Sequence, residues 1–192
     1  MNWREFWSIS YLFSPLLVGL ATHGFSIKFG WLGFLTRPID GGKSFRGKRI
    51  FGENKTYRGV FAVALGTALG FGIQTFVLHR FEAVQRLELL EYSVGTVGIG
   101  FLIGAAAMLS ELLNSFIKRQ LGIAPGKTTS GLLSGFFYVL DQIDLLIGAW
   151  LVLAFLVSVT LWRVVFSAVF LFFSHQLISL IGYALGMRKT AR

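Results

Sequence analysis

Five long apolar stretches constrain this chain more than any other feature of its sequence. They cover roughly residues 6–28, 60–78, 92–113, 143–159 and 164–187. A helix needs about 20 mostly apolar residues to cross the hydrocarbon core of a bilayer. Only 14% of the residues are charged, which is low for a soluble domain. The sequence therefore predicts an all-α integral membrane protein with about five transmembrane helices, organised as one membrane-embedded domain over residues 1–192.

Basic residues are distributed unevenly between the two sides of this topology. Seven Lys or Arg residues lie in the segment 36–58, three in 114–140 and three in the tail, whereas the segments on the opposite side hold four. Lys and Arg concentrate in the cytoplasmic loops of membrane proteins. We therefore expect the N-terminus outside and the C-terminus in the cytoplasm. Two functional loops would then face the cytoplasm at the cell membrane.

Composition also restricts the chemistry and the partners. The chain has no cysteine, which excludes a thiolate metal site and a cysteine nucleophile. Its formal net charge is +9, and the basic residues lie in loops between apolar stretches, which predicts contact with anionic membrane lipids and no nucleic-acid partner. Glycines in the second and third stretches predict close packing of helices and permit a homodimer. They include Gly66, Gly70, Gly100 and Gly104.

Two carboxylates stand at the start of the fourth apolar stretch. Asp141 and Asp144 are three residues apart, so they share one face of a helix. Carboxylates near membrane depth are costly and need a partner. Mg²⁺ typically takes one or two carboxylates and fills its other positions with water and substrate phosphates. These residues alone leave two interpretations open, a Mg²⁺ site or an N-cap at Asp141 with Asp144 stabilised by the helix dipole.

A third carboxylate, Glu111, ends the third apolar stretch. It lies four residues before Ser115 and seven before Lys118, so the three positions fall near one helical face. We expect Glu111 to be either a further metal ligand or the ion-pair partner of Lys118 or Arg119.

The segment 52–59 leads directly into the second apolar stretch. Backbone N–H groups at a helix start, together with Lys55, Thr56 and Arg58, would suit a bound anion. The spacing is not that of a P-loop, and a basic membrane anchor would explain the charge but not the Asn-Lys-Thr order. Asp40 lies in a Pro-Ile-Asp-Gly-Gly turn, whose geometry alone explains an Asp before Gly.

The three histidines give a weaker signal. His175 lies in an apolar helix beside Ser174 and Gln176, which favours a hydrogen-bonded residue of a helix bundle. His23 and His79 are placed as interfacial residues.

Taken together, the motifs resemble the CDP-archaeol synthase family, small membrane relatives of the phosphatidate cytidylyltransferases. The resemblance runs from about Pro38 to the tail. It rests on Pro-Ile-Asp-Gly-Gly from Pro38, Gly-Glu-Asn-Lys-Thr-Tyr-Arg-Gly from Gly52, Ser-Phe-Ile-Lys-Arg from Ser115, Leu-Gly-Ile from Leu121 and Asp-Gln-Ile-Asp from Asp141. It implies a five-helix membrane enzyme that uses CTP and Mg²⁺ to convert a lipid phosphate to a CDP-lipid and pyrophosphate.

Individual residues match the family pattern unevenly. Ser115, Lys118 and Arg119 match its S-x-x-K-R segment, and Asp141 and Asp144 match the paired aspartates implicated there in metal binding. Lys55, Thr56 and Gly59 match its lysine-threonine-x-x-glycine segment. Ser110 and Glu111 replace the usual Gly-Asp, and Ala124-Pro125 replaces a Lys-Asp of the wider family. These departures leave open whether the lipid carries ether-linked isoprenoid or ester-linked acyl chains.

The resemblance also implies a division of roles. Asp141 and Asp144 would hold Mg²⁺, with Glu111 as a possible third ligand, while Lys118 and Arg119 would hold phosphates. Contacts with CTP and the lipid phosphate would come from Asn54, Lys55, Thr56, Arg58 and Ser115. Asp40 would bind cytidine or orient the basic loop.

Two functions of other classes remain as alternatives. A small membrane transporter could use Asp141 and Asp144 as ion ligands. A non-catalytic scaffold could bind anionic lipids through the basic loops.

Overall fold

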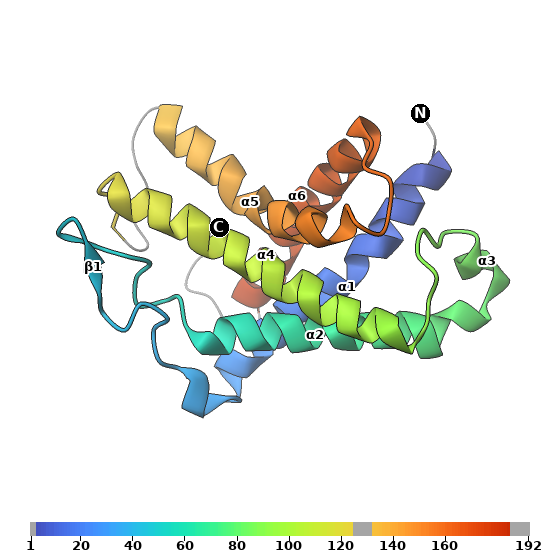
Figure 1. Cartoon of the computed structure of the whole chain (residues 1–192), viewed down its shortest axis with the longest axis horizontal. Coiled ribbons are helices and arrows are strands. Elements are labelled where there is room, and N and C mark those ends of the chain that lie inside the picture. The colour runs from blue at the N-terminus through green and yellow to red at the C-terminus, as the bar shows by residue number, and fades with distance from the viewer. Residues whose placement is uncertain (1–2, 125–131, 185–192) are drawn as a thin grey trace.

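The computed structural model describes residues 3–124 and 132–184, and five long helices account for most of them (Figure 1). These are α1 (Trp3–Lys28), α2 (Tyr57–Phe76), α4 (Val94–Gln120), α5 (Leu132–Leu153) and α6 (Leu161–Ala184). The short elements are η1 (Gly33–Leu35), β1 (Ser44–Phe45), β2 (Lys48–Arg49), η2 (Leu78–Arg80) and α3 (Glu82–Gln85). The predicted all-α class is confirmed, with one two-residue hairpin added.

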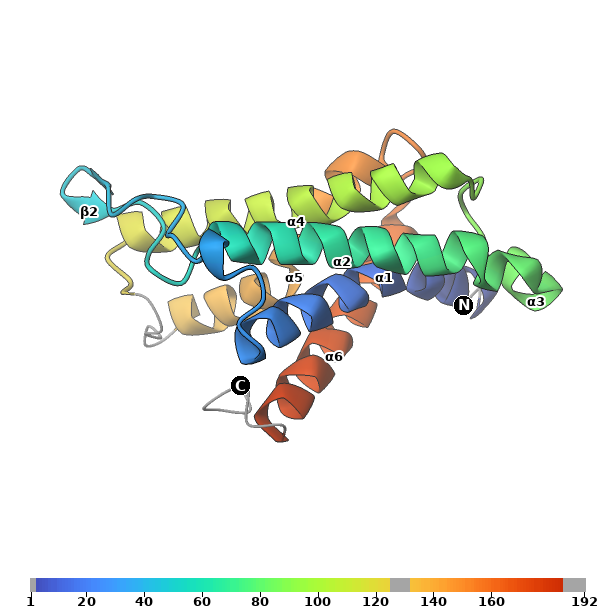
Figure 2. The ribbon, with the colours of Figure 1, turned by 90° about the horizontal axis from the view of Figure 1, so that it is seen from below.

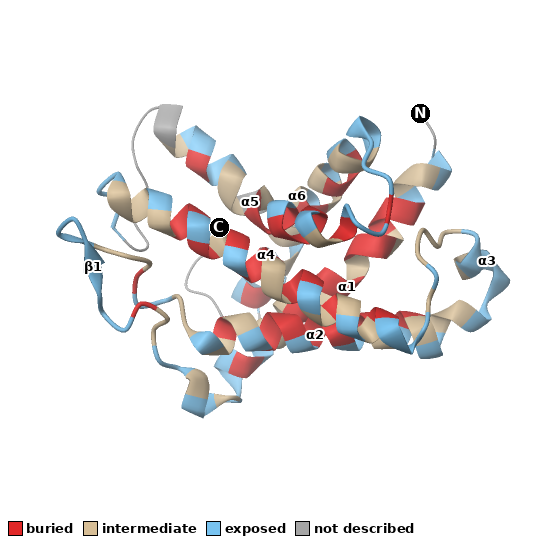
Figure 3. Ribbon diagram, viewed as in Figure 1, coloured by how far each residue is buried: buried red, intermediate tan, exposed pale blue. Residues whose placement is uncertain are grey.

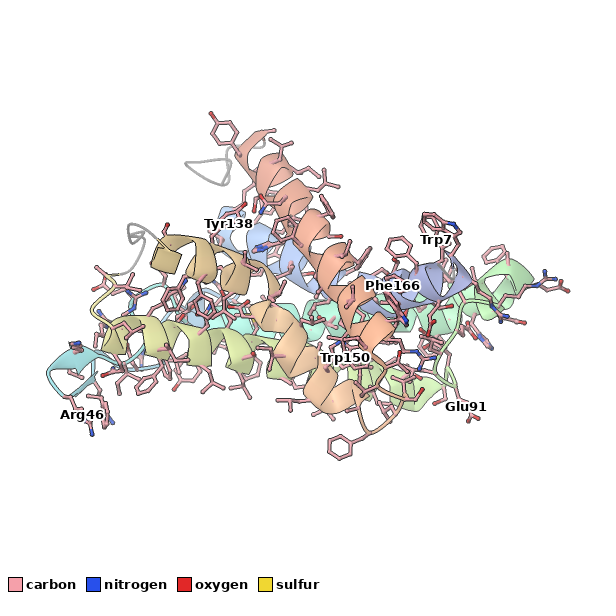
Figure 4. All side chains as sticks on the ribbon, turned by 90° about the horizontal axis from the view of Figure 1, so that it is seen from above. Trp7, Arg46, Glu91, Tyr138, Trp150 and Phe166 are labelled. Atoms are coloured by element: carbon pink, nitrogen blue, oxygen red, sulfur yellow. The ribbon has the colours of Figure 1, made fainter. Side chains whose placement is uncertain are left out.

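The hairpin β1–β2 follows from its turn residues. Arg46 and Gly47 both have positive φ, 51° and 74°, as a tight two-residue hairpin turn requires, and Phe45 pairs with Lys48 across it. Figure 1 places this hairpin at one end of the long axis and α3 at the other. Arg46 points outward from its tip, far from Glu91 (Figure 4).

Helix α2 lies between α1 and α4, α5 packs on α4, and α6 contacts α1 and α5. Figure 2 shows α2 and α4 side by side along the molecule, whereas α6 leaves the bundle obliquely. Buried residues concentrate where these helices meet (Figure 3), and they include Ile9, Phe13, Leu16 and Phe71. Trp150 joins α5 to α6, because its Nε1 donates to Ser167 Oγ at 2.9 Å.

Small residues set the close approach of α2 to its neighbours, as the sequence predicts for Gly66, Gly70, Gly100 and Gly104. A Cβ added at Gly66 would lie 2.8 Å from Gly19 Cα in α1. One added at Gly104 would lie 2.7 Å from Ala64 Cα. Both distances are below van der Waals contact, so any side chain there would push the helices apart.

A proline inside α1 is matched by a side chain of α2. Pro15 has no N–H, so the carbonyl of Tyr11 loses its usual partner within the helix. Gln74 Nε2 donates to that oxygen at 2.7 Å. Gly70 accommodates the ring, since a Cβ there would lie 2.7 Å from Pro15 Cα. The position of α1 along α2 is thereby fixed by both polar and steric contacts.

Within the described residues, three helical segments are long and apolar enough to cross a membrane, namely Tyr57–Arg80, Val94–Gln120 and Leu161–Ala184. A fourth is added if Ser134–Asp141 and Ile143–Leu153, which meet at a bend of 46°, form one broken span. Helix α1 has 26 residues but carries four serines, is more polar than these segments and is not among the candidate spans. The count of five spans and the orientation therefore stay predictions. Several basic residues used for the orientation, Lys127, Arg188, Lys189 and Arg192, lie outside the described residues.

We expect Gly104→Ala to destabilise the protein by about 1–3 kcal/mol, because the new methyl group overpacks the contact with α2. Gly98→Ala is the matched control on the same helix, since a Cβ there meets nothing within 4 Å. It should be neutral or stabilising by up to about 1 kcal/mol. Thermal unfolding in detergent, followed by circular dichroism, measures both. Equal stability of the two variants would contradict the packing role of Gly104.

Candidate functional site

The loop between α1 and α2 is organised around the buried carboxylate of Asp40. Its oxygens accept hydrogen bonds from the backbone N–H groups of Gly42 (2.9 Å), Phe51 (3.1 Å) and Gly52 (2.9 Å), and from Arg49 Nε at 3.2 Å. Burial opposes ionisation, but the Arg49 guanidinium and these N–H groups outweigh it and hold the pKa of Asp40 well below its usual range. Asp40 therefore folds the loop back on itself.

The same loop is closed on itself and held against α4 and the start of α2. Ile39 N donates to Lys55 O at 2.8 Å, and Arg119 Nε of α4 donates to Phe51 O at 3.1 Å. Thr56 caps α2, because its hydroxyl accepts from Gly59 N at 3.4 Å. These contacts hold Asn54, Lys55 and Thr56 beside the C-terminal half of α4.

Helices α4 and α5 meet through a cluster of polar side chains. Asn114 Nδ2 donates to Asp141 Oδ1 at 2.7 Å and to Asp144 Oδ2 at 2.8 Å. Lys118 Nζ donates to both carboxylate oxygens of Asp141. Ser110 Oγ donates to the backbone oxygen of Asp144 at 2.7 Å. Asp144 is only 3% exposed, so its charge depends on these neighbours.

Glu111 connects this cluster to the loop. Lys55 Nζ lies 2.6 Å from Glu111 Oε1, and the two residues are 56 positions apart in the chain. The expected partners of Glu111 were Lys118 and Arg119. Instead, Lys118 binds Asp141, and Arg119 donates to the backbone oxygens of Phe51 and Ile123.

Two adjoining cavities, of about 300 and 150 Å³, open between the loop, α4, α5 and α6, and the smaller one also reaches α1 and α2. We call them the polar cavities because charged and amide side chains line both, although apolar residues share the walls of the smaller one. Both are lined by Asn54, Lys55, Glu111, Asp141, Asp144 and His175. Asn114, Ser115, Lys118 and Arg119 add to the larger cavity, and Thr56 adds to the smaller one. The structure thus brings together nine of the eleven residues that the sequence predicts for the site. Asp40 and Arg58 line neither cavity.

A third cavity, of about 260 Å³, lies between α1 and α6 and is mostly apolar. It shares Leu20 and His23 with the smaller polar cavity, and His175 lines all three. We expected His175 to be a hydrogen-bonded residue of the helix bundle and His23 an interfacial residue, and both stay predictions. In the structure, both lie where the polar and apolar cavities meet.

Asn114 is the member of the cluster that the sequence motifs do not predict. Its signal in the sequence is position alone, because it precedes Ser115 and lies four residues before Lys118, on the same face of α4. An asparagine carries no charge and fits no metal or nucleotide motif, so this signal is weak.

The predicted metal ligands are only partly assembled. Within residues 3–124 and 132–184, no group of three or more His, Asp or Glu side chains is arranged to hold a metal ion. Glu111 is engaged by Lys55, whereas Asp141 and Asp144 each direct an oxygen to one amide nitrogen. A metal site at the two aspartates stays a prediction.

Comparison with known proteins identifies the family. The family model described as "CarS-like: CDP-archaeol synthase" matches residues 14–191. The chain belongs to the CDP-archaeol synthase family. The CDP-archaeol synthase of Saccharolobus solfataricus is 34% identical over 155 residues, covering 79% of this chain and 80% of the relative. That of Methanococcoides burtonii is 30% identical over 164 residues, covering 80% and 89%.

A solved structure shares the fold. It is described as an intramembrane enzyme for archaeal membrane lipids biosynthesis, and it superposes with a TM-score of 0.62 at 22% identity. The match covers 88% of this chain and 90% of that one. The family and the apolar helices together indicate that the chain is a multi-pass membrane protein.

We expect Asp40→Asn to loosen the loop, because an amide cannot accept all of the N–H groups that surround the carboxylate. The loss should be about 1–3 kcal/mol. The depressed pKa of Asp40 means that its contribution is present above the ordinary value near 3.9 and is lost as the pH falls below it. Limited proteolysis between Lys43 and Lys55, measured from pH 7 to pH 3, follows both effects.

Glu53→Gln is the matched control, because Glu53 binds the same Arg49 at 2.9 Å but its side chain is 78% exposed. It should leave the cleavage rate unchanged. A loop equally resistant in Asp40→Asn would refute the organising role of Asp40.

Proposed function

We propose that this protein is a CTP-dependent cytidylyltransferase of phospholipid biosynthesis that converts a membrane lipid phosphate to a CDP-lipid and pyrophosphate. The supporting observation is the junction of polar and apolar cavities at His175, with Lys55, Lys118, Asp141 and Asp144 on the polar side. The relatives' name favours an archaeal ether lipid as substrate, and a phosphatidate-like ester is the alternative.

An amphiphilic substrate fits this arrangement. Its chains would occupy the apolar cavity between α1 and α6, and its phosphate would reach the polar cavities beside His175. CTP would bind in the larger polar cavity, where Asn54, Lys55, Ser115 and Arg119 supply donors for a triphosphate. Thr56 would contact the nucleotide from the smaller cavity. Arg58 has no place in this set, since it lines neither cavity.

The reaction needs positioning more than proton transfer. An oxygen of the lipid phosphate would attack the α-phosphorus of CTP, forming one P–O bond while the bond to the β-phosphate breaks and pyrophosphate leaves. A phosphomonoester has a second pKa of about 6, so the nucleophile is already largely ionised near neutral pH. Lys118 and Arg119 would hold the two anions close together, which is the main task in reactions of this class.

The residues of the cluster also fit a divalent cation. Oxygens from Asp141 and Asp144 converge on Asn114 Nδ2, at 2.7 and 2.8 Å, so two carboxylates of different residues face one position. Asp141 and Asp144 would hold Mg²⁺, which prefers such oxygen ligands. When bound, the ion would neutralise charge on the triphosphate. Glu111 would stay with Lys55 and align it, rather than act as a third ligand.

We place the site at the cytoplasmic face of the cell membrane. The seven basic residues of the segment 36–58, which forms the site's loop, support this orientation. Gly66 and Gly104, two of the small residues that the sequence offers for a dimer face, pack against helices of the same chain, so the homodimer stays a prediction without structural support.

The deciding experiment measures pyrophosphate release by the detergent-purified protein with Mg²⁺, CTP and a panel of ether- and ester-linked lipid phosphates. Release that requires all three components would support the proposal, and the best lipid would define the substrate class. A folded protein that releases none with any lipid would refute it. Ion flux through vesicles or nucleotide-independent vesicle binding would then favour the transporter or the scaffold.

We expect Asp144→Ala to abolish turnover while the protein still inserts into the membrane. The reason is that the carboxylate is buried in the polar cluster and would be a cation ligand. Pyrophosphate release measures turnover, and gel filtration in detergent checks folding. Activity like that of the wild type would remove Asp144 from the mechanism.

Lys118→Ala should raise KM for the lipid phosphate or CTP about tenfold or more, the size expected for losing a hydrogen bond to a charged group. Lys48→Ala is the control, since Lys48 donates to the backbone oxygen of Gln120 nearby but lines no polar cavity. Initial rates with each substrate varied in turn give both constants. Unchanged constants in Lys118→Ala would refute its phosphate role.

A further inference from the structure

Asn114 occupies the centre of the cluster between α4 and α5. It is only 6% exposed and lines the larger polar cavity. Its Nδ2 uses both of its hydrogens on carboxylates, one on Asp141 and one on Asp144. Among the described residues, no other side chain donates a hydrogen bond to both aspartates, so Asn114 lies at the point where their oxygens converge.

The other end of the same amide is left without a partner. Asn114 Oδ1 is buried, and no donor among the described residues forms a hydrogen bond with it. A buried, unsatisfied acceptor costs roughly 1–3 kcal/mol. Native structures tolerate such an atom where it serves a ligand or an ion.

The amide can present either atom to the aspartates. A half-turn about its terminal torsion exchanges Oδ1 and Nδ2 with almost no change of shape. With Oδ1 turned toward Asp141 and Asp144, three oxygens would face one another, which is repulsive unless a cation lies between them. Such a set of carboxylate and carbonyl oxygens suits Mg²⁺ or Mn²⁺.

We propose that Asn114 is an oxygen ligand of the divalent cation, and that its amide turns Oδ1 toward Asp141 and Asp144 when the cation binds. This inference rests on the proposed function, because it concerns the cation of that same site. Without the cation, Nδ2 holds the two carboxylates together; with it, Oδ1 completes a ligand set drawn from both α4 and α5.

A purely structural role for Asn114 makes a different prediction. If the residue served only as a donor to the carboxylates, aspartate at this position would fail as alanine does, because an ionised aspartate donates no hydrogen bond. If it is an oxygen ligand, aspartate should retain cation binding. The variants Asn114→Ala and Asn114→Asp therefore separate the two roles.

The test measures Mn²⁺ binding to the purified protein by electron paramagnetic resonance, without CTP or lipid. We expect Asn114→Ala to weaken binding at least about tenfold, and Asn114→Asp to bind at least as tightly as the wild type. The part of the Mn²⁺ signal that is lost in Asp144→Ala is the part that belongs to this site. Gln74→Ala is the matched control, because Gln74 is an equally buried amide in α2 that bonds to α1. It should bind Mn²⁺ normally even if it is less stable.

A second variant gives a direct readout of ligation. The chain has no cysteine, so Asn114→Cys introduces its single thiol. Cd²⁺ should then produce the ultraviolet absorption of a cadmium–thiolate bond, and Mn²⁺ should compete with it. Absence of that band in folded Asn114→Cys would count against ligation at this position.

Three outcomes would overturn the inference. Mn²⁺ affinity in Asn114→Ala equal to that of the wild type would remove Asn114 as a ligand, and loss of binding in Asn114→Asp would reduce it to a donor. Either result would leave the proposed function intact, because CTP-dependent pyrophosphate release tests that function separately. Wild-type protein that binds no Mn²⁺ would overturn the ligand assignment together with the cation site.

Discussion

Burial of the Asp144 carboxylate between α4 and α5 is the interaction on which the site depends. Removing a carboxylate from water costs several kcal/mol unless partners replace its hydration. Asn114 Nδ2 and the backbone N–H of Leu145 supply two hydrogen bonds at 2.8 Å each. Asn114 can donate to Asp144 only if its face of α4 is turned toward α5. Lys118 lies on the same face, so this orientation also brings its Nζ to Asp141. One buried carboxyl group thereby fixes how the two helices face each other.

These polar contacts form only because the backbones of α1, α2 and α4 approach one another closely. Gly66 and Gly104 leave α2 in direct contact with α1 and α4, so the loop that precedes α2 reaches the C-terminal half of α4. Lys55 then meets Glu111, and Arg119 meets the backbone of Phe51. The charged loop and the apolar helices thus form one site, although they are far apart in the chain and differ in composition.

Most residues of this site can be predicted from the sequence. The contacts between them depend on packing, which the sequence does not display. The length of the apolar stretches predicts the helices, and the motifs predict Lys55, Lys118, Asp141 and Asp144, because these residue types are unusual beside a membrane. The predicted ion-pair partners of Glu111, Lys118 or Arg119, were wrong. Its actual partner, Lys55, lies in a loop 56 positions away, and the contact depends on how that loop folds. The roles of Asn114 and His175 depend on which helices pack together, and no short motif records that.

The hydrogen bond from Gln74 to the Tyr11 carbonyl determines which wall of the apolar cavity between α1 and α6 can move. Sliding α1 along α2 by one helical turn, 5.4 Å, would break the hydrogen bonds from Gln74 Nε2 to the Tyr11 carbonyl and to Ser14 Oγ. It would also carry the Pro15 ring away from the recess at Gly70. Helix α1 therefore behaves as the fixed wall. Any widening of the cavity then falls to α6, whose outer residues, such as Phe173 and Leu177, are exposed.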